Sequence, residues 1–509
     1  MSEKHNSIAK SAILVTAMML SFKIIGFIKQ AFIAYYFGAT LETDTYFIAW
    51  GFVSGVSEAI VKALSVSLVA VYTGLRLQKG KNEAAKLVNG LIEILFPLFA
   101  GLAVLLFVAS PVFTRLLAPS YTGEQYSQLV FYIRILAPVL IFGCLELIFG
   151  AVNDSYKSFY IPRLQSLIYS LAIILSCVFL SKSLNVGALV LGQYASSIVF
   201  AIILIVSVKK WHKFALVRYR DIPELKSILV TAIPLFIGNS ALQINQIVDK
   251  SITSGLGEGA ASALSYCHTL EQFVTNIMIV NIGNVMFANF AEFVAKKEDQ
   301  NIIGSLSKAI NLLIVILTAI SVITIFSAKD IVSIVYYRGS FTQNAVNLTS
   351  LALIGYAISF VCVAVRDLSV KSLYAFKDTK SPMISCIICI AINIFFSILL
   401  SKFIGILGVS IATSISAFVG MILNARSVKK HLGSYKYFDH FITFLKCCPA
   451  AIILGIICYT LNANLTVGSL LKFMIICAVG FGVYFTILYI QGLKEIREAA
   501  KIIQNKFSR

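Results

Sequence analysis

Charged side chains occur inside several apolar stretches of this sequence, where burial in a membrane is costly and by default marks a pathway or a buried pair. Lys23 and Lys29 lie in the first stretch, Lys62 in the second and Lys250 in the seventh. Few acidic residues accompany the first two lysines, so their ammonium groups would attract anions. We therefore expect these four lysines to contact a phosphate-bearing ligand through charge-assisted hydrogen bonds.

Acidic residues in the same stretches would shape this field or act as gates. Asp44 and Glu58 lie in the second stretch, Asp249 in the seventh and Glu271 in the eighth. Glu58 precedes Lys62 by four residues, so the two can meet on one helix face and simply neutralise each other. Polar positions concentrate on stretches one, two, seven and eight, which predicts a hydrated cavity built from those four helices.

The composition indicates a membrane protein rather than a soluble one. Of the 509 residues, 59% are hydrophobic and 13% are charged, whereas soluble domains have about 25% charged residues. Apolar runs of about 20 residues, long enough to cross a bilayer, recur along the chain. We place about fourteen transmembrane helices at 11–36, 43–76, 87–109, 126–152, 161–181, 185–208, 227–254, 260–291, 303–327, 343–372, 381–402, 405–428, 440–462 and 468–491.

The net charge of +19 follows the topology of these spans and does not indicate nucleic-acid binding. Lysines and arginines cluster after every second span, in particular between the second and third spans and between the sixth and seventh, and again in the C-terminal tail. The other loops carry few. This alternation is the positive-inside pattern and predicts that both termini are cytoplasmic.

The chain also repeats itself at an offset of 220 positions. The matching residues are Lys157 with Lys377, Pro162 with Pro382, Tyr46 with Tyr266, and Ser120-Tyr121-Thr122 with Ser340-Phe341-Thr342. Duplicated halves are common in membrane transporters. Because each half would hold six spans, an even number, the halves should share one orientation about a pseudo-twofold axis along the membrane normal.

We therefore predict an all-α polytopic membrane protein of two six-helix lobes in parallel repeat, followed by two C-terminal helices. The N-terminal lobe covers residues 1–208, and a basic cytoplasmic linker covers 209–226. The second lobe covers 227–430, and the two additional helices with a basic tail cover 431–509.

Three motifs resemble the MurJ/MviN family of lipid II flippases, within the multidrug/oligosaccharidyl-lipid/polysaccharide exporter superfamily. The first runs from Gly26-Phe27-Ile28-Lys29-Gln30-Ala31 through Phe37-Gly38-Ala39 to Thr43-Asp44-Thr45-Tyr46-Phe47. The second is Tyr336-Tyr337-Arg338-Gly339-Ser340-Phe341-Thr342. The third, the most specific, is Leu373-Tyr374-Ala375-Phe376-Lys377-Asp378-Thr379-Lys380-Ser381-Pro382. The resemblance covers essentially the whole chain.

The resemblance implies a flippase of the bacterial cytoplasmic membrane that moves an undecaprenyl-pyrophosphate-linked saccharide outward by alternating access. Asp44 matches the family pattern, but other cavity positions diverge. Lys23 and Lys29 replace arginines, which loses bidentate hydrogen bonding, and Ser57 and Thr269 stand where two further arginines are expected. This divergence leaves open an O-antigen, capsule or exopolysaccharide repeat unit as the cargo instead of lipid II.

Other functions are less well supported by the residues. A drug exporter that exchanges organic cations for protons or sodium would need a net acidic cavity. A membrane glycosyltransferase or ligase would need a large catalytic loop, and a scaffold would not need a polar interior. We predict no enzyme activity, no metal and no cofactor, with possible coupling to the membrane potential, Na+ or H+. The expected partners are the polyprenyl-linked saccharide, the lipid bilayer and envelope-synthesis proteins, with no nucleic acid.

Overall fold

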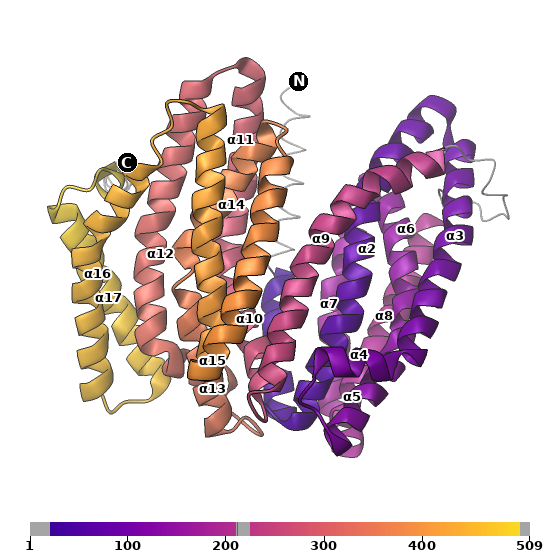
Figure 1. The fold of residues 1–509 in the computed structure, drawn as a ribbon, viewed down its shortest axis with the longest axis horizontal. Helices are drawn as coiled ribbons and strands as arrows, with labels where there is room; N and C mark the ends of the chain where they lie inside the picture. Colours follow the sequence, from indigo (N-terminus) through magenta and orange to yellow (C-terminus); the bar gives the residue numbers. More distant parts are fainter. Residues whose placement is uncertain (1–20, 210, 212–223, 499–509) are drawn as a thin grey trace, which may run out of the picture. The chain divides into compact units, whose positions relative to one another are not determined.

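The computed structural model describes residues 21–209, 211 and 224–498, and this part of the chain is helical with no strand (Figure 1). Within it, ten helices are long and apolar enough to cross a membrane, or eleven if one bent pair forms a single span. This confirms the all-α polytopic class. The number of fourteen spans stays a prediction, because the first predicted span begins outside the described residues.

The chain divides into two compact units. The first comprises Met1–Ser262 with Gly339–Phe341, and the second comprises Ala263–Arg338 with Thr342–Arg509. The predicted lobe limits at 208 and 227 fall inside the first unit, because the helix that begins the second predicted lobe packs along a helix of the first.

The first unit is built around one long helix, α2, which packs against α5, α6 and α9. Its helices are residues 21–37, α2 (Leu41–Lys79), α3 (Lys81–Val108), α4 (Ser110–Leu117), α5 (Gly123–Leu136), η1 (Ala137–Val139), α6 (Leu140–Ser155), α7 (Tyr160–Leu184), α8 (Gly187–Val208) and α9 (Glu224–Ser254). α7 and α8 pack against each other, and α6 joins them to α2. The α2–α9 contact places residues far apart in sequence on neighbouring helices.

Local sequence explains where α2 begins and ends. Thr40 caps its N-terminus through a reciprocal capping box with Thr43, and two acidic residues in the first turn complement the helix dipole. The helix ends at Gly80, whose φ of 88° is in a region that glycine adopts without strain. Between these signals the helix runs for 39 residues, long enough to cross a bilayer with tilt.

The second unit is built around α12, which contacts α11, α13, α14, α16 and α17 (Figure 1). Its helices are α10 (Ala260–Thr275), which begins in the first unit, η3 (Asn276–Val280), α11 (Asn281–Lys296), α12 (Asp299–Tyr336), α13 (Gln343–Ala357), α14 (Phe360–Ala375), α15 (Lys380–His431), α16 (Phe438–Asn464) and α17 (Ser469–Ile490). α15 contains the two spans predicted at 381–402 and 405–428, and its backbone breaks at Ile404 and Gly405.

The two C-terminal helices pack onto α12 through an apolar core that includes Leu313, Leu454 and Tyr484. One ion pair reinforces this contact, with Lys472 Nζ on α17 lying 3.4 Å from Asp330 Oδ1 on α12. Both side chains are largely buried. Removal of either partner alone would leave an uncompensated buried charge.

The 220-residue repeat is visible in the backbone. α6 covers Leu140–Ser155 and α14 covers Phe360–Ala375, so both helices begin and end at equivalent positions. Lys157 and Lys377 then adopt left-handed conformations with φ of 60° and 62°. Each lysine lies in a Schellman motif with the same two hydrogen bonds. Ser158 N donates to Asn153 O and Asp378 N to Leu373 O, both at 2.9 Å. Lys157 N donates to Asp154 O and Lys377 N to Tyr374 O, both at 3.0 Å.

A short segment distant in sequence completes the first unit. Ser340 N donates to Tyr35 O at 2.8 Å, and the Ser340 hydroxyl donates to Tyr36 O at 3.1 Å. Gly339 and Gly38 both have positive φ and approach the opposing backbone so closely that a Cβ at either would lie 2.3 Å from a carbonyl oxygen. The glycines of the first two family motifs therefore allow these two segments to meet.

Candidate functional site

Lys29 lies half-buried between the helix over residues 21–37 and α7. Its Nζ is 4.2 Å from the centroid of the Tyr169 ring, a cation–π contact, which contributes about 0.5–2 kcal/mol depending on desolvation. Lys23, six residues earlier, is exposed. The two lysines predicted from the first stretch therefore occupy different environments, and only Lys29 is held by a neighbouring helix.

Lys250, on α9, is directed at α2. Its Nζ donates to the backbone carbonyl of Phe47 at 3.0 Å. The ammonium fits there because residue 51 is glycine, and a Cβ at Gly51 would lie 2.3 Å from Nζ. Lys250 therefore links α9 to α2 through this hydrogen bond, and its ammonium group places a positive charge at the contact.

Glu58 and Lys62 form an ion pair on α2, as their spacing predicts. Lys62 Nζ lies 2.6 Å from Glu58 Oε2, and the two side chains are about half exposed. Gln243 on α9 reaches the same Glu58 oxygen at 3.5 Å. Surface pairs of this kind contribute about 0–1 kcal/mol, so the pair can open to a ligand at little cost.

Asp44 is almost completely buried near the start of α2. Its Oδ2 accepts from Gly259 N at 2.7 Å, and its Oδ1 accepts from both the backbone N and the hydroxyl of Ser262 at 2.6 Å. Asp44 thus caps the N-terminus of α10, where the helix dipole favours a negative charge. This carboxylate connects α2, in the first repeat, to the N-terminus of α10, the second helix of the second repeat.

The remaining predicted residues are distributed over both units. Asp249 is buried on α9, and Asn245 Nδ2 lies 3.5 Å from its Oδ2. In the second unit, the Thr269 hydroxyl donates to Ser265 O at 3.2 Å, and Glu271 Oε2 lies 3.3 Å from His268 Nδ1. Thr269 and Glu271 thus form local contacts on α10, whereas Glu58 and Lys250 bond across the α2–α9 contact of the first unit.

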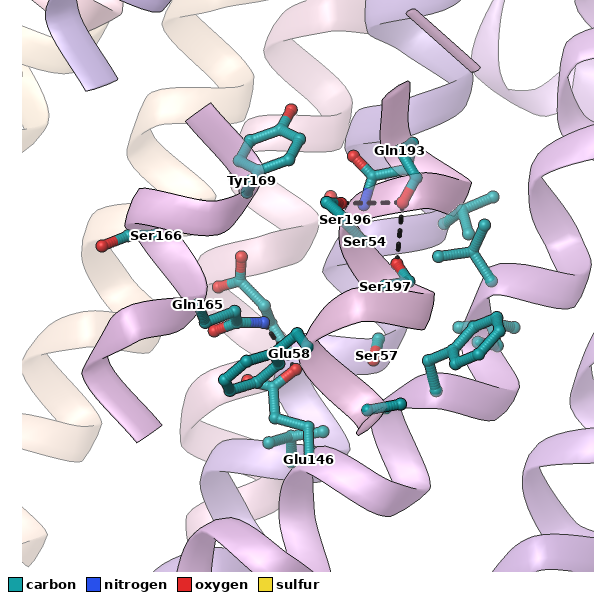
Figure 2. A pocket seen from close by; sticks show the side chains of 18 of the residues that line it. Ser54, Ser57, Glu58, Glu146, Gln165, Ser166, Tyr169, Gln193, Ser196 and Ser197 are labelled. Atoms are coloured by element: carbon teal, nitrogen blue, oxygen red, sulfur yellow. Dashed lines mark hydrogen bonds between the residues drawn. The ribbon is translucent and has the colours of Figure 1, made fainter. Parts of the chain in front are cut away.

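A pocket inside the first unit was not predicted from the sequence (Figure 2). Its walls are α2, α6, α7 and α8 with one residue of η1, and its volume is about 450 Å³. Ser57, Glu58 and Lys62 border it, but so do Glu146 and Gln193, which were not singled out. A glutamate within the apolar run 140–152 is a signal that could have identified it.

Among the described residues, neither Lys29 nor Lys250 forms an ion pair, because the pairs found there join other side chains. A buried cation without a carboxylate partner is costly. The first unit therefore holds two partly buried positive charges that an anion could neutralise.

A helical chain with ten or eleven apolar spans among its described residues, and with lysines in its first unit that have no carboxylate partner there, is the architecture of a polytopic membrane transporter. The fold matches a solved "Lipid II flippase MurJ, inward closed conformation" with a TM-score of 0.82 and 22% identity, over 94% of this chain and 98% of that one. It also matches an inward-facing multidrug resistance MATE family transporter of the MOP superfamily, with a TM-score of 0.68 and 15% identity over 82% of this chain.

The family described as "Lipid II flippase MurJ" matches residues 33–479, and the chain belongs to that family. The lipid II flippase MurJ of Burkholderia cenocepacia is 21% identical over 95% of this chain and 98% of its own length. The probable lipid II flippase MurJ of Rickettsia prowazekii is 24% identical over 83% of this chain and 84% of its own length. The resemblance inferred from the three motifs is thereby confirmed.

Proposed function

We propose that this protein moves lipid II, an undecaprenyl-pyrophosphate-linked saccharide, from the inner to the outer leaflet of the bacterial cytoplasmic membrane. Membership of the lipid II flippase family supports the substrate class. The observation that carries the proposal is the pair of lysines, Lys29 and Lys250, that lack a carboxylate partner among the described residues. A pyrophosphate offers the compensating charge and accepts hydrogen bonds from ammonium groups.

The proposed substrate-binding residues are Lys23, Lys29, Lys62 and Lys250. Lys62 would exchange Glu58 for the pyrophosphate, which its solvent-exposed ion pair permits. Lys250 would keep its bond to Phe47 O while its remaining protons contact the ligand. Asp249, Ser57, Thr269 and Glu271 would shape the polar interior.

Asp44 acts in this proposal as a gate. Its three hydrogen bonds to the start of α10 hold together the ends of two helices that belong to different repeats. Alternating access requires such a contact to break when the protein opens on that side. Three hydrogen bonds to one charged carboxylate stabilise the closed state, and all three are lost together when Asp44 moves away from α10.

The transport step needs neither bond cleavage nor a cofactor. A membrane potential that is negative inside favours outward movement of an anion by about 2.3 kcal/mol per charge per 100 mV. Coupling to this potential, to Na+ or to H+ would drive the cycle. Both termini would lie in the cytoplasm, where envelope-synthesis proteins could deliver the substrate.

Complementation tests the proposal. A bacterium depleted of its resident lipid II flippase would express this chain, and the amount of lipid II in the outer leaflet would be measured. We expect restored growth together with outer-leaflet lipid II. Failure in spite of confirmed membrane expression would contradict lipid II as the cargo and would favour an O-antigen, capsule or exopolysaccharide repeat unit.

A further inference from the structure

The pocket inside the first unit has a largely apolar lining, but each of its four helices contributes polar side chains to it (Figure 2). Glu58 comes from α2, Glu146 from α6, Gln165 from α7 and Gln193 from α8. Its accessible side is marked by Glu58 and Lys62, which are about half exposed. A volume of about 450 Å³ lies within the range of about 300–1,000 Å³ that is usual for small-molecule sites.

Several of the polar groups in the pocket present hydrogen-bond acceptors. Gln193 is only 6% exposed, and its Oε1 has no hydrogen-bond partner among the described residues. Ser196 and Ser197 donate their hydroxyl protons to the backbone carbonyl of Gln193 at 2.7 and 2.9 Å, so only their lone pairs remain for a ligand. An unsatisfied buried acceptor costs about 1–3 kcal/mol, which a donor from a ligand would offset.

Glu146 adds carboxylate acceptors at the opposite wall. Gln165 Nε2 donates to its Oε2 at 2.6 Å, which orients the carboxylate with one amide. Glu58 contributes a second carboxylate at the accessible side. The pocket therefore suits a ligand with several hydrogen-bond donors distributed around it.

An aromatic surface accompanies these acceptors. Trp50 and Tyr169 both line the pocket, and their ring centroids lie 6.2 Å apart with the planes tilted by 33°. Tyr and Trp present an apolar body beside polar groups. A sugar ring has the complementary surface, with hydroxyl donors at its edge and C–H groups on its faces. A bare cation fits less well, because metal-ligand oxygens must approach within about 2.0–2.6 Å and this pocket is much wider.

We propose that this pocket is a subsite for a sugar ring of the lipid-linked saccharide. Glu146 and Gln193 accept hydrogen bonds from sugar hydroxyls, and Trp50 and Tyr169 contact the ring. The inference rests on the proposed function, because it takes the saccharide of that substrate as the ligand. It assigns the pyrophosphate to the lysines, of which Lys62 borders the pocket, and the sugar to the acceptors inside the pocket.

The test compares two ligands on the full-length purified protein, lipid II and undecaprenyl pyrophosphate, which lacks the sugar. We expect Glu146→Gln and Gln193→Ala to weaken lipid II binding by about tenfold or more, because a site built to bind hydroxyls discriminates strongly through them. Binding of undecaprenyl pyrophosphate should be unchanged. Glu124→Gln and Gln128→Ala are matched controls, since these side chains bond each other in the first turns of α5 in the same unit and do not line the pocket.

Each outcome distinguishes the subsite from the proposed function. Unchanged lipid II binding by both variants would overturn the subsite, as would an equal loss of both ligands. Altered dependence on Na+ or pH with unaltered sugar preference would identify a cation site instead. A wild-type protein that binds neither ligand would overturn the proposed function and the subsite together. If Glu146→Gln does not fold, Gln193→Ala carries the same comparison.

Discussion

The ring of Tyr156 stacks on the ring of Trp211, with centroids 4.4 Å apart and planes 8° from parallel. The same relationship recurs 220 positions later, where Phe376 and His431 stack at 5.1 Å and 7°. Both stacks follow the helix end that closes in a Schellman motif. The two repeats thus share a stacked contact at equivalent positions, although the ring pairs differ in chemistry.

Reversal of charge at Lys29 should abolish transport. In Lys29→Glu a carboxylate would replace the ammonium above the Tyr169 ring, whose negative face repels it. It would also repel a pyrophosphate. We expect outer-leaflet lipid II to fall to background with normal membrane expression, whereas Lys29→Arg retains at least partial activity. Lys182→Glu, the same change at an exposed position of the same unit, serves as the control. Normal export by Lys29→Glu would contradict the proposed binding site.

Neutralisation of Asp44 should weaken the contact with α10. Asp44→Asn presents an amide donor to backbone donors that now bind a carboxylate, and hydrogen bonds to charged groups contribute about 1.5–3 kcal/mol each. Ser262→Ala removes only one of these bonds, the one from the hydroxyl, and should therefore cost about 1.5–3 kcal/mol, less than Asp44→Asn. Thermal unfolding in detergent should therefore rank wild type above Ser262→Ala and Ser262→Ala above Asp44→Asn. Equal midpoints for all three proteins would show that this contact does not stabilise the closed state.

The Asp378–His431 pair should make stability depend on pH at the acidic end. Burial alone would raise the pKa of Asp378, but hydrogen bonds from Ser381 and His431 outweigh it and lower this pKa from 3.8 to about 2. Because the folded-state pKa is depressed, the stabilisation is present above about pH 4 and is lost as the pH falls through about 2.

Thermal midpoints of wild type and Asp378→Asn between pH 7 and pH 2 measure this effect. We expect wild type to be more stable at pH 7 by about 1 kcal/mol, after allowance for solvent screening, and the difference to close below pH 4. Asp299→Asn, in an exposed first turn of α12, controls for general charge effects. A difference that persists unchanged at the lowest pH would exclude the pair as its source.

Substitution of Gly339 should disrupt the contact between the two family motifs. Its φ is +59° and an added Cβ would lie 2.3 Å from Tyr35 O, so Gly339→Ala combines a clash with backbone and about 1–2 kcal/mol of left-handed strain. We expect a lower unfolding temperature and reduced transport. Gly74→Ala, within α2 where a Cβ meets open space, should be neutral or stabilising. Equal stability of Gly339→Ala and wild type would refute the role of this contact.

The sequence predicted the features that depend on neighbouring residues. Apolar runs located most helices, and the spacing of Glu58 and Lys62 predicted their ion pair. The 220-residue offset between Lys157 and Lys377 predicted a structural repeat, and both residues adopt the same left-handed backbone conformation. These signals are local because hydropathy and helix periodicity act over one or a few turns.

Contacts between distant segments were not predictable in this way. Nothing near Asp44 indicates that its partners lie more than 200 residues away in α10. Glu146 and Gln193 become a pocket only because four helices pack around them. Lys250 was predicted as a charge inside a span, but its bond to Phe47 O depends on the glycine opposite it.

The docking of Gly339–Phe341 onto the first unit also constrains the order of biosynthesis. The unit's main part ends at Ser262, but its last component emerges from the ribosome about eighty residues later, a delay of roughly 4–16 s at 5–20 residues per second. During that interval the backbone carbonyls of Tyr35 and Tyr36 lack the Ser340 donors that bind them in the folded protein. The nascent chain therefore cannot complete its first unit before all of α12 (Asp299–Tyr336) has been translated, and the two units mature in an interleaved order rather than one after the other.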